Sequence, residues 1–175
     1  MNVYLFPTEY EAEPFRHLRP DAEIIITGVG MAATAAAIVA LDRRKHLVAS
    51  DVVVLAGVAG SYSDDIAVGE VVEVESEQCV ELPKRFRQRY YQRVSHTSLR
   101  RVASNTVHRA AAEQADAGVE NMEGAALFAL AEVIGFAAVE LRAVSNRVGE
   151  SFDKWSMQEA VEALARELAK LEDGK

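Results

Sequence analysis

The feature that most constrains the fold is the alternation of short apolar runs with helix-forming stretches along the chain. Six runs have the length and composition of strands: residues 3–6, 23–27, 51–56, 69–74, 101–107 and 136–144. Four stretches are predicted helices: one starting at residue 8, where Thr8 and Glu11 form a capping pattern, and those over 31–41, 122–134 and 156–171. This order predicts an α/β protein, a three-layer α/β/α domain with a mixed, largely parallel central sheet. Residues 76–98 are predicted to be irregular.

Length and charge limit the function classes. The 175 residues suit a single domain over residues 1–175, and the net charge of −8 argues against binding to nucleic acid or anionic membranes. The basic run at residues 84–93 has the composition of a short RNA-binding segment, although a solvated loop or a subunit contact is the favoured interpretation.

Metal and disulfide chemistry find little support in the sequence. Cys79 is the only cysteine, which excludes an internal disulfide and a cysteine-based zinc site. The four histidines lack metal-ligand spacing: His17, His46, His96 and His108. The N-terminus has no signal-peptide pattern and no apolar run reaches membrane-spanning length, so we expect a cytoplasmic protein. We also expect no metal and no organic cofactor.

Two glycine-containing segments follow predicted strands. They are Gly28-Val29-Gly30 and Gly57-Val58-Ala59-Gly60, and both are interpreted as turns. In α/β sheets, ligands bind beyond the carboxyl ends of parallel strands, where glycine allows close approach to the backbone. Neither segment completes a dinucleotide-binding fingerprint, since Ala33 occupies the third glycine position. Two tight turns without a ligand remain the alternative.

A carboxylate and an amide stand at informative positions. Glu123 lies at the start of a small-residue helix in the segment Val-Glu-Asn-Met-Glu-Gly-Ala-Ala, residues 119–126. Asn146 ends the apolar strand that contains Leu-Arg-Ala-Val-Ser-Asn, residues 141–146. Delivered to one edge of a sheet, the two side chains suit a ligand with sugar hydroxyls and a heterocycle edge. The structural alternative is a helix-terminal acid favoured by the helix dipole and an amide that caps a strand.

These segments, in this order, resemble the nucleoside phosphorylase and nucleosidase superfamily, which includes methylthioadenosine/adenosylhomocysteine nucleosidase. Residues 119–126, together with Ser-Asn-Arg-Val-Gly at 145–149 and Asp-Lys-Trp at 153–155, are most similar to futalosine hydrolases of the menaquinone pathway. The resemblance covers most of the chain. The chain is shorter than typical members between Gly69 and Glu120, and Val58 replaces a small hydroxyl residue of the adenine nucleosidases.

The resemblance implies roles for particular residues. Glu11 matches the carboxylate that orients the attacking water, Glu123 the one that binds the ribose hydroxyls, and Asn146 the residue that recognises the base. Further substrate contacts are expected from Gly28, Val29, Gly30, Val58, Ala59, Gly60, Asn121, Met122 and Ser145. We expect Asn105 and Thr106 to lie near the pocket, and Trp155 to serve in packing or at an interface.

The implied reaction is hydrolysis of the N-glycosidic bond of a purine nucleoside, in which one carboxylate binds the ribose hydroxyls and a second holds the attacking water. An amide at the base accepts from N7–H and donates to a 6-oxo group, so the expected substrate is a futalosine-like nucleoside that releases hypoxanthine. Alternatives are a methylthioadenosine/adenosylhomocysteine nucleosidase, a purine nucleoside phosphorylase, and a nucleoside-binding protein without catalysis. The family implies a homodimer or a higher homo-oligomer.

Overall fold

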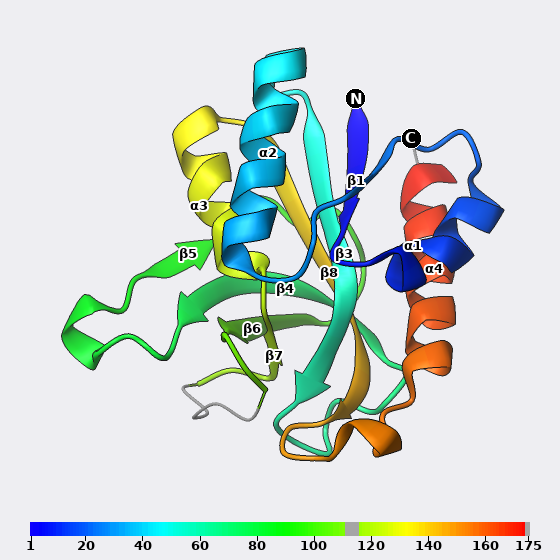
Figure 1. Cartoon of the computed structure of the whole chain (residues 1–175), viewed down its shortest axis with the longest axis vertical. Helices are drawn as coiled ribbons and strands as arrows, with labels where there is room; N and C mark the ends of the chain where they lie inside the picture. The colour runs from blue at the N-terminus through cyan, green and yellow to red at the C-terminus, as the bar shows by residue number, and fades with distance from the viewer. Residues whose placement is uncertain (111–115, 174–175) are drawn as a thin grey trace.

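The computed structural model describes residues 1–110 and 116–173, which form a mixed sheet with helices on both faces (Figure 1). The strands are β1 (Asn2–Phe6), β2 (Ile24–Ile26), β3 (Val52–Ser61), β4 (Val71–Cys79), β5 (Arg89–Tyr91), β6 (Arg101–Thr106), β7 (Val119–Asn121) and β8 (Ala137–Arg147). The helices are α1 (Glu9–Leu18), α2 (Met31–Lys45), α3 (Gly124–Ile134) and α4 (Met157–Asp173), with 3₁₀ turns at Lys84–Phe86 and Phe152–Lys154.

The sheet has the predicted mixed and largely parallel character. Its strands follow the order β2-β1-β3-β7-β6-β4-β5, and β8 pairs with both β3 and β4. Parallel pairs join β1 to β2 and β3, β3 to β8, and β6 to β4 and β7. The pairs β3–β7, β4–β5 and β4–β8 are antiparallel. Because β8 bridges β3 and β4, the strands β3, β7, β6, β4 and β8 make a closed ring of pairings.

Two apolar layers fix the helices on the sheet. On one face, Ile38 of α2 and Leu127 of α3 belong to a buried cluster with the sheet. On the other, Phe15 of α1 and Leu164 of α4 belong to a second cluster. Figure 1 shows α2 and α3 to the left of the sheet and α1 and α4 to its right. The predicted three-layer α/β/α arrangement is confirmed.

Two local predictions were wrong, and one strand was not predicted. Residues 57–60 do not form a turn, because β3 continues through them to Ser61 and pairs with β8 along this whole stretch, with a bulge between Ala59 and Gly60. The glycines there allow side chains to approach the strand closely and do not reverse the chain. The segment 76–98 is not wholly irregular, since β4 extends to Cys79 and β5 follows it. The three-residue strand β7 is too short to give a sequence pattern of its own.

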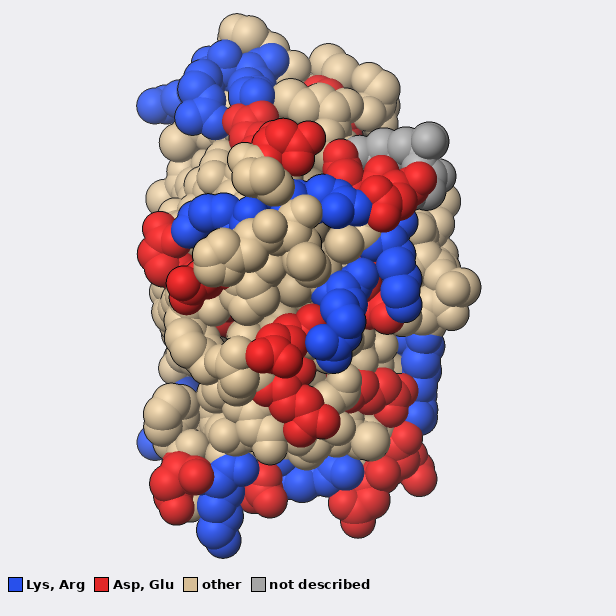
Figure 2. Space-filling model, turned by 90° about the vertical axis from the view of Figure 1, so that its right-hand side faces the viewer, with Lys and Arg blue, Asp and Glu red and all other residues tan. Residues whose placement is uncertain are grey.

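The surface carries both signs of charge. Figure 2 shows the side on which α1 and α4 lie, and acidic and basic side chains are interspersed over it. Within the described ranges, no helix has the length and apolarity needed to cross a bilayer.

Candidate active site

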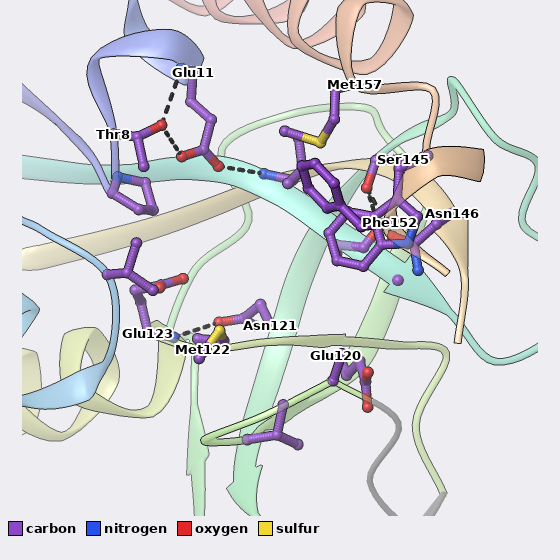
Figure 3. Close-up of a pocket in the computed structure, with 18 of the residues that line it drawn as sticks. Thr8, Glu11, Glu120, Asn121, Met122, Glu123, Ser145, Asn146, Phe152 and Met157 are labelled. Atoms are coloured by element: carbon purple, nitrogen blue, oxygen red, sulfur yellow. Dashed lines mark hydrogen bonds between the residues drawn. The ribbon is translucent and has the colours of Figure 1, made fainter. Parts of the chain in front are cut away.

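A cavity of about 670 Å³ lies where the carboxyl ends of β1, β2, β3 and β8 meet (Figure 3). This is the edge at which parallel α/β sheets bind ligands. The cavity is lined by Pro7, Thr8, Tyr10, Glu11, Val29, Val58, Ala59, Gly60, Val107, Ala110, Glu120, Asn121, Met122, Glu123, Ser145, Asn146, Phe152, Trp155 and Met157. Ten of the twelve residues predicted to form the site are therefore brought together.

Glu11 stands on one wall, in the first turn of α1. Thr8 caps this helix, and its hydroxyl accepts from the Glu11 backbone N–H while donating to Glu11 Oε2 at 2.6 Å. The Val58 backbone N–H donates to Glu11 Oε1 at 3.0 Å. Burial raises the pKa of Glu11, against the opposing effects of the bonds from Thr8 and Val58 and of the charge on Arg142. The site thus holds an oriented carboxyl group that takes up a proton more readily than an exposed glutamate.

Glu123 faces Glu11 across this end of the cavity, at the N-cap of α3 (Figure 3). Its Oε1 accepts a hydrogen bond from the Gly30 backbone N–H at 2.9 Å, and its Oε2 lies 3.2 Å from Nη1 of Arg142. Asn121 Oδ1 accepts from the backbone N–H groups of Glu123 and Gly124, both at 2.8 Å. Glu123 is only 3 % exposed, and these contacts hold it in place without a ligand.

Arg142 supplies the positive charge behind the two carboxylates. It projects from β8, is 1 % exposed, and also donates to Asn121 Oδ1 at 2.9 Å. A Cβ added at Gly57 would lie 2.6 Å from Arg142 Nη1 and 2.9 Å from Glu11 Oε1. The bare backbone of Gly57 is therefore what lets the guanidinium and Glu11 come close to each other.

The other end of the cavity carries an amide and a third carboxylate. The hydroxyl of Ser145 donates to Asn146 Oδ1, and Asn146 Nδ2 donates to the Arg147 carbonyl, both at 2.8 Å. Glu120 lies across from Asn146 in Figure 3 and accepts from the Tyr62 hydroxyl at 2.8 Å. An amide oxygen has two lone pairs and an amide nitrogen two hydrogens, so Asn146 keeps one acceptor and one donor position for a ligand.

Apolar side chains complete the walls. Phe152 and Trp155 come from the loop after β8, with ring centroids 5.1 Å apart, and Met157 opens α4. Phe152 is 71 % exposed despite lining the cavity, so its ring is available to cover a ligand. Trp155 was predicted to serve in packing or at an interface; it also lines the cavity.

Some predicted residues lie outside the cavity lining. Gly28 and Gly30 are not part of it, although Gly30 holds Glu123 and both glycines have positive φ. Asn105 donates to the Tyr62 hydroxyl, and Thr106 donates to Glu77 and accepts from the Ala125 N–H. Neither lines the cavity, but both support residues that lie nearer to it.

Sequence reasoning missed several contributors to the site. Thr8 was recognised only as a helix cap, and Glu120, Tyr10 and Phe152 were not singled out. The ion pairs of Arg142 were also missed. The sequence did contain a signal for Arg142. Glu140 and Arg142 are two positions apart, so they share one face of an otherwise apolar strand, and charged residues buried there are expected to be paired. Among the described residues no group of His, Cys, Asp and Glu side chains is arranged to hold a metal ion.

Comparison with known proteins identifies the family. The model of the Phosphorylase superfamily matches residues 75–171, more than half of the chain. The chain belongs to this superfamily. A superfamily relative, the futalosine hydrolase of Thermus thermophilus, is 31 % identical over an alignment of 217 positions that covers 98 % of this chain and 95 % of the relative. Since the alignment is longer than this chain, the relative carries segments that this member of the superfamily lacks.

Solved structures share the superfamily fold. The 5′-methylthioadenosine/S-adenosylhomocysteine nucleosidase of Helicobacter pylori, crystallised with butyl-thio-DADMe-Immucillin-A, matches with a TM-score of 0.84 at 15 % identity. The alignment covers 99 % of this chain and 98 % of that chain. A futalosine hydrolase mutant of H. pylori matches with the same TM-score and identity and covers 99 % of both chains. At these identities the likeness concerns the fold.

Proposed function

We propose that this superfamily member is a nucleosidase that hydrolyses the N-glycosidic bond of a futalosine-like purine nucleoside, acting as one domain over residues 1–175. The observation that carries the proposal is the placement of Glu11 and Glu123 on facing walls at one end of a cavity, with Asn146 at its other end. The relationship to the Thermus futalosine hydrolase supports the choice of substrate.

The carboxylate end suits the sugar. Cleavage of an N-glycosidic bond develops positive charge on the ribose, and a carboxylate that accepts from the 2′- and 3′-hydroxyls stabilises that charge. Glu123 is assigned this role because the Gly30 N–H and Arg142 already hold it at the cavity wall. Met122, next to it, packs beside the sugar.

Glu11 is assigned as the general base. Its carboxylate accepts from Thr8 and Val58, which aims it into the cavity opposite Glu123. A base of raised pKa binds the proton of an attacking water more strongly than an ordinary glutamate does. The water then attacks the anomeric carbon from the face opposite the leaving purine.

The amide end suits the base. Ser145 and the Arg147 carbonyl orient Asn146. Once N7 of the departing purine has taken up a proton from solvent, the remaining lone pair of Asn146 accepts from N7–H while its remaining N–H donates to a 6-oxo group. Adenine presents a 6-amino donor at that position, which opposes the amide N–H. This favours a 6-oxopurine, and futalosine over methylthioadenosine.

Hydrolysis is favoured over phosphorolysis by the cavity's charges. No lysine or arginine occurs among the described residues that line it, and Arg142, behind the wall, already faces Glu123, Glu140 and Asn121. A bound phosphate needs cationic or backbone donors, and the Gly30 N–H is taken by Glu123.

The proposal extends to the oligomeric state and to the cellular location of the protein. Exposed apolar side chains, among them Phe86, Tyr91 and Val133, support a homodimer or higher homo-oligomer. The expected setting is the cytoplasm, in menaquinone biosynthesis. Light scattering coupled to size-exclusion chromatography measures the oligomeric state directly.

The function is tested by following free base from futalosine, aminofutalosine and methylthioadenosine, each with and without phosphate. We expect hypoxanthine from futalosine at a rate independent of phosphate, and slower release of adenine from the other two. Glu123→Gln and Glu11→Gln serve as inactive controls, with losses of roughly 10²-fold or more. Phosphate-dependent release would instead indicate a phosphorylase, and tight binding without turnover a nucleoside-binding protein.

A further inference from the structure

Directly behind the cavity wall, carboxylates outnumber cations. Glu77 and Glu140 are fully buried, and Arg142 and Glu123 are 1 % and 3 % exposed. Arg142 Nε lies 2.8 Å from Glu140 Oε1, and its Nη1 lies 3.2 Å from Glu123 Oε2. Three ionised carboxylates against one guanidinium would leave a net negative charge in the protein interior, which is very unfavourable. The cluster therefore retains a proton.

The carboxyl groups of Glu77 and Glu140 meet at the start of α3. A Cβ added at Gly124 would lie 2.3 Å from Glu77 Oε1 and 2.5 Å from both carboxyl oxygens of Glu140. Both groups thus crowd the same small volume, which only glycine at position 124 leaves open. Because oxygens of both groups approach this one point, ionising both is unfavourable, for the reason that applies to carboxylate dyads in general.

Hydrogen bonding distinguishes the two groups. Glu77 accepts from the Thr106 hydroxyl at 2.6 Å and from Asn121 Nδ2, so donors already face both of its oxygens. Glu140 Oε1 accepts from Arg142 Nε, but Glu140 Oε2 is buried without a hydrogen-bond partner. We infer that a proton on Glu140 Oε2 removes this deficit by donating towards Glu77, whose Oε1 crowds the same point beside Gly124.

The electrostatics agree with this assignment. Burial and the neighbouring charge of Glu77 raise the pKa of Glu140 well above its ordinary value, against the attraction of Arg142 and with a further contribution from Glu123. Burial also raises the pKa of Glu77, but bonds from Thr106, Ser104 and Asn121 and the charge of Arg142 oppose that rise. Glu77, Arg142 and Glu123 are the charged groups that face Glu140 from β4, β8 and the start of α3.

We propose that Glu140 is a positioning residue that acts in its protonated form. Its carbonyl oxygen holds Arg142 through Nε, and its O–H donates to Glu77, so Arg142 keeps its full charge for Glu123 and Glu11 at the cavity wall. The kinetic consequence rests on the nucleosidase function proposed above, whereas the protonation state does not.

The decisive variant is Glu140→Gln, because an amide reproduces the protonated acid. Its oxygen accepts from Arg142 Nε and its NH₂ donates to Glu77. We expect kcat/KM on futalosine to stay within about threefold of the wild type, less than the loss of one charged hydrogen bond would cause. Glu140→Leu removes the acceptor and leaves Arg142 Nε–H unpaired, so we expect kcat to fall roughly 10- to 100-fold. Glu77→Gln places an NH₂ against donors and is expected to lower stability and activity.

Stability against pH tests the proton without relying on activity. The native state binds a proton at Glu140 that the unfolded chain releases above the ordinary glutamate pKa, so Glu140 lowers the free energy of unfolding as pH rises beyond that value. Glu140→Gln has no such proton, so its stability relative to the wild type should increase from pH 4.5 towards neutrality. Denaturant titrations at several pH values measure this difference. Glu73→Gln, at a buried carboxylate whose pKa is lowered, is the matched control: its difference from the wild type should stay level over this range and change only below the ordinary glutamate pKa.

Three results would overturn the assignment. One is a stability difference between Glu140→Gln and the wild type that does not vary with pH. Another is a tenfold or greater loss of kcat/KM in Glu140→Gln, which would mean that an ionised Glu140 is required. The third is wild-type activity and stability in Glu77→Gln together with losses of both in Glu140→Gln, which would place the proton on Glu77. If the wild type fails to hydrolyse futalosine, the proposed function fails, while the stability measurement still decides the protonation of Glu140.

Discussion

Asn146 has its amide orientation set before a ligand binds. The Ser145 hydroxyl donates to one end of this amide and the Arg147 carbonyl accepts from the other; because a carbonyl cannot donate, turning the amide over would oppose the bond to Arg147. A buried amide held in this way discriminates between bases, because a mismatched ligand leaves polar groups unpaired. Under the proposed function, selectivity for the purine base is thus a property of one side chain and its two neighbours.

Asn146→Asp should shift selectivity towards adenine nucleosides. The introduced oxygen would lie against the Arg147 carbonyl in place of Nδ2, which favours the protonated carboxyl and provides an acid for N7. We expect the ratio of kcat/KM for methylthioadenosine to that for futalosine to rise about tenfold or more. Asn146→Ala is the control: it removes the amide without supplying an acid, so it should lower futalosine turnover without a gain on methylthioadenosine. An unchanged ratio in Asn146→Asp would contradict the base assignment.

Helix α1 and strand β3 jointly position Glu11, the proposed general base. Thr8 begins the helix and donates to Glu11 Oε2, while β3 offers the Val58 N–H and, at Gly57, room for Arg142. The local pattern Thr8-x-x-Glu11 is that of a capping box, but the Glu11 side chain bonds β3 and the Thr8 hydroxyl. The start of a helix is thereby combined with the positioning of a carboxylate.

Thr8→Val should move the acid limb of the pH–rate profile to higher pH. Burial raises the pKa of Glu11, and the bond from Thr8 lowers it, so removal of that bond raises the pKa further. A general base acts when ionised, and activity therefore appears only at higher pH. The variant also loses its helix cap, at a cost of about 1 kcal/mol. Thr8→Ser retains both bonds and should keep the wild-type profile; an unshifted limb in Thr8→Val would argue against Glu11 as the base.

Gly57→Ala should damage the site with little change elsewhere in β3. The new methyl group would overlap Arg142 Nη1, which is too deeply buried to move away, and would press on Glu11. We expect kcat to drop at least tenfold, and stability to fall by about 1–3 kcal/mol, as in other overpacked interiors. Val54→Ala, on the same strand but outside the cavity lining, removes atoms without a clash and serves as the control for kcat. Wild-type kcat in Gly57→Ala would show that the close approach is unimportant.

For the whole molecule, Glu73 ties the segment after β5 to the sheet. This fully buried carboxylate accepts hydrogen bonds from the Gln92 side chain, the Ser95 hydroxyl, the His96 and Thr97 backbone N–H groups and the Thr97 hydroxyl. Burial opposes ionisation of Glu73, but these donors outweigh it and keep its pKa below the ordinary value. Hydrogen bonds to a carboxylate on β4 thus hold a part of the chain that has no regular secondary structure.

Glu73→Gln should lower the free energy of unfolding by about 2–3 kcal/mol near neutral pH, because an NH₂ group meets donors that need an acceptor. A native pKa below the unfolded value gives stability that is present above the unfolded pKa and is lost as pH falls through the native pKa. The difference between variant and wild type should therefore shrink in acid. Urea titrations between neutral and acidic pH measure it, and a difference that grew in acid would contradict this account.

The sequence by itself determined the layer order and most of the cavity residues. Apolar runs and helix starts are local signals, and parallel strands bring their carboxyl ends to one edge, so Glu11, Glu123 and Asn146 could be expected to converge. The resemblance to the superfamily supplied their roles, which no periodicity contains.

Only the tertiary structure decided how these residues are held. Whether 57–60 turned or stayed extended depended on pairing with β8, and the direction of Arg142 depended on partners from three separate elements. Glu77 and Glu140, 63 positions apart in the chain, meet because β8 is paired with β4 and α3 begins with a glycine above them. Such long-range contacts leave no local pattern, because they depend on strand pairing and packing between segments that are distant in the chain.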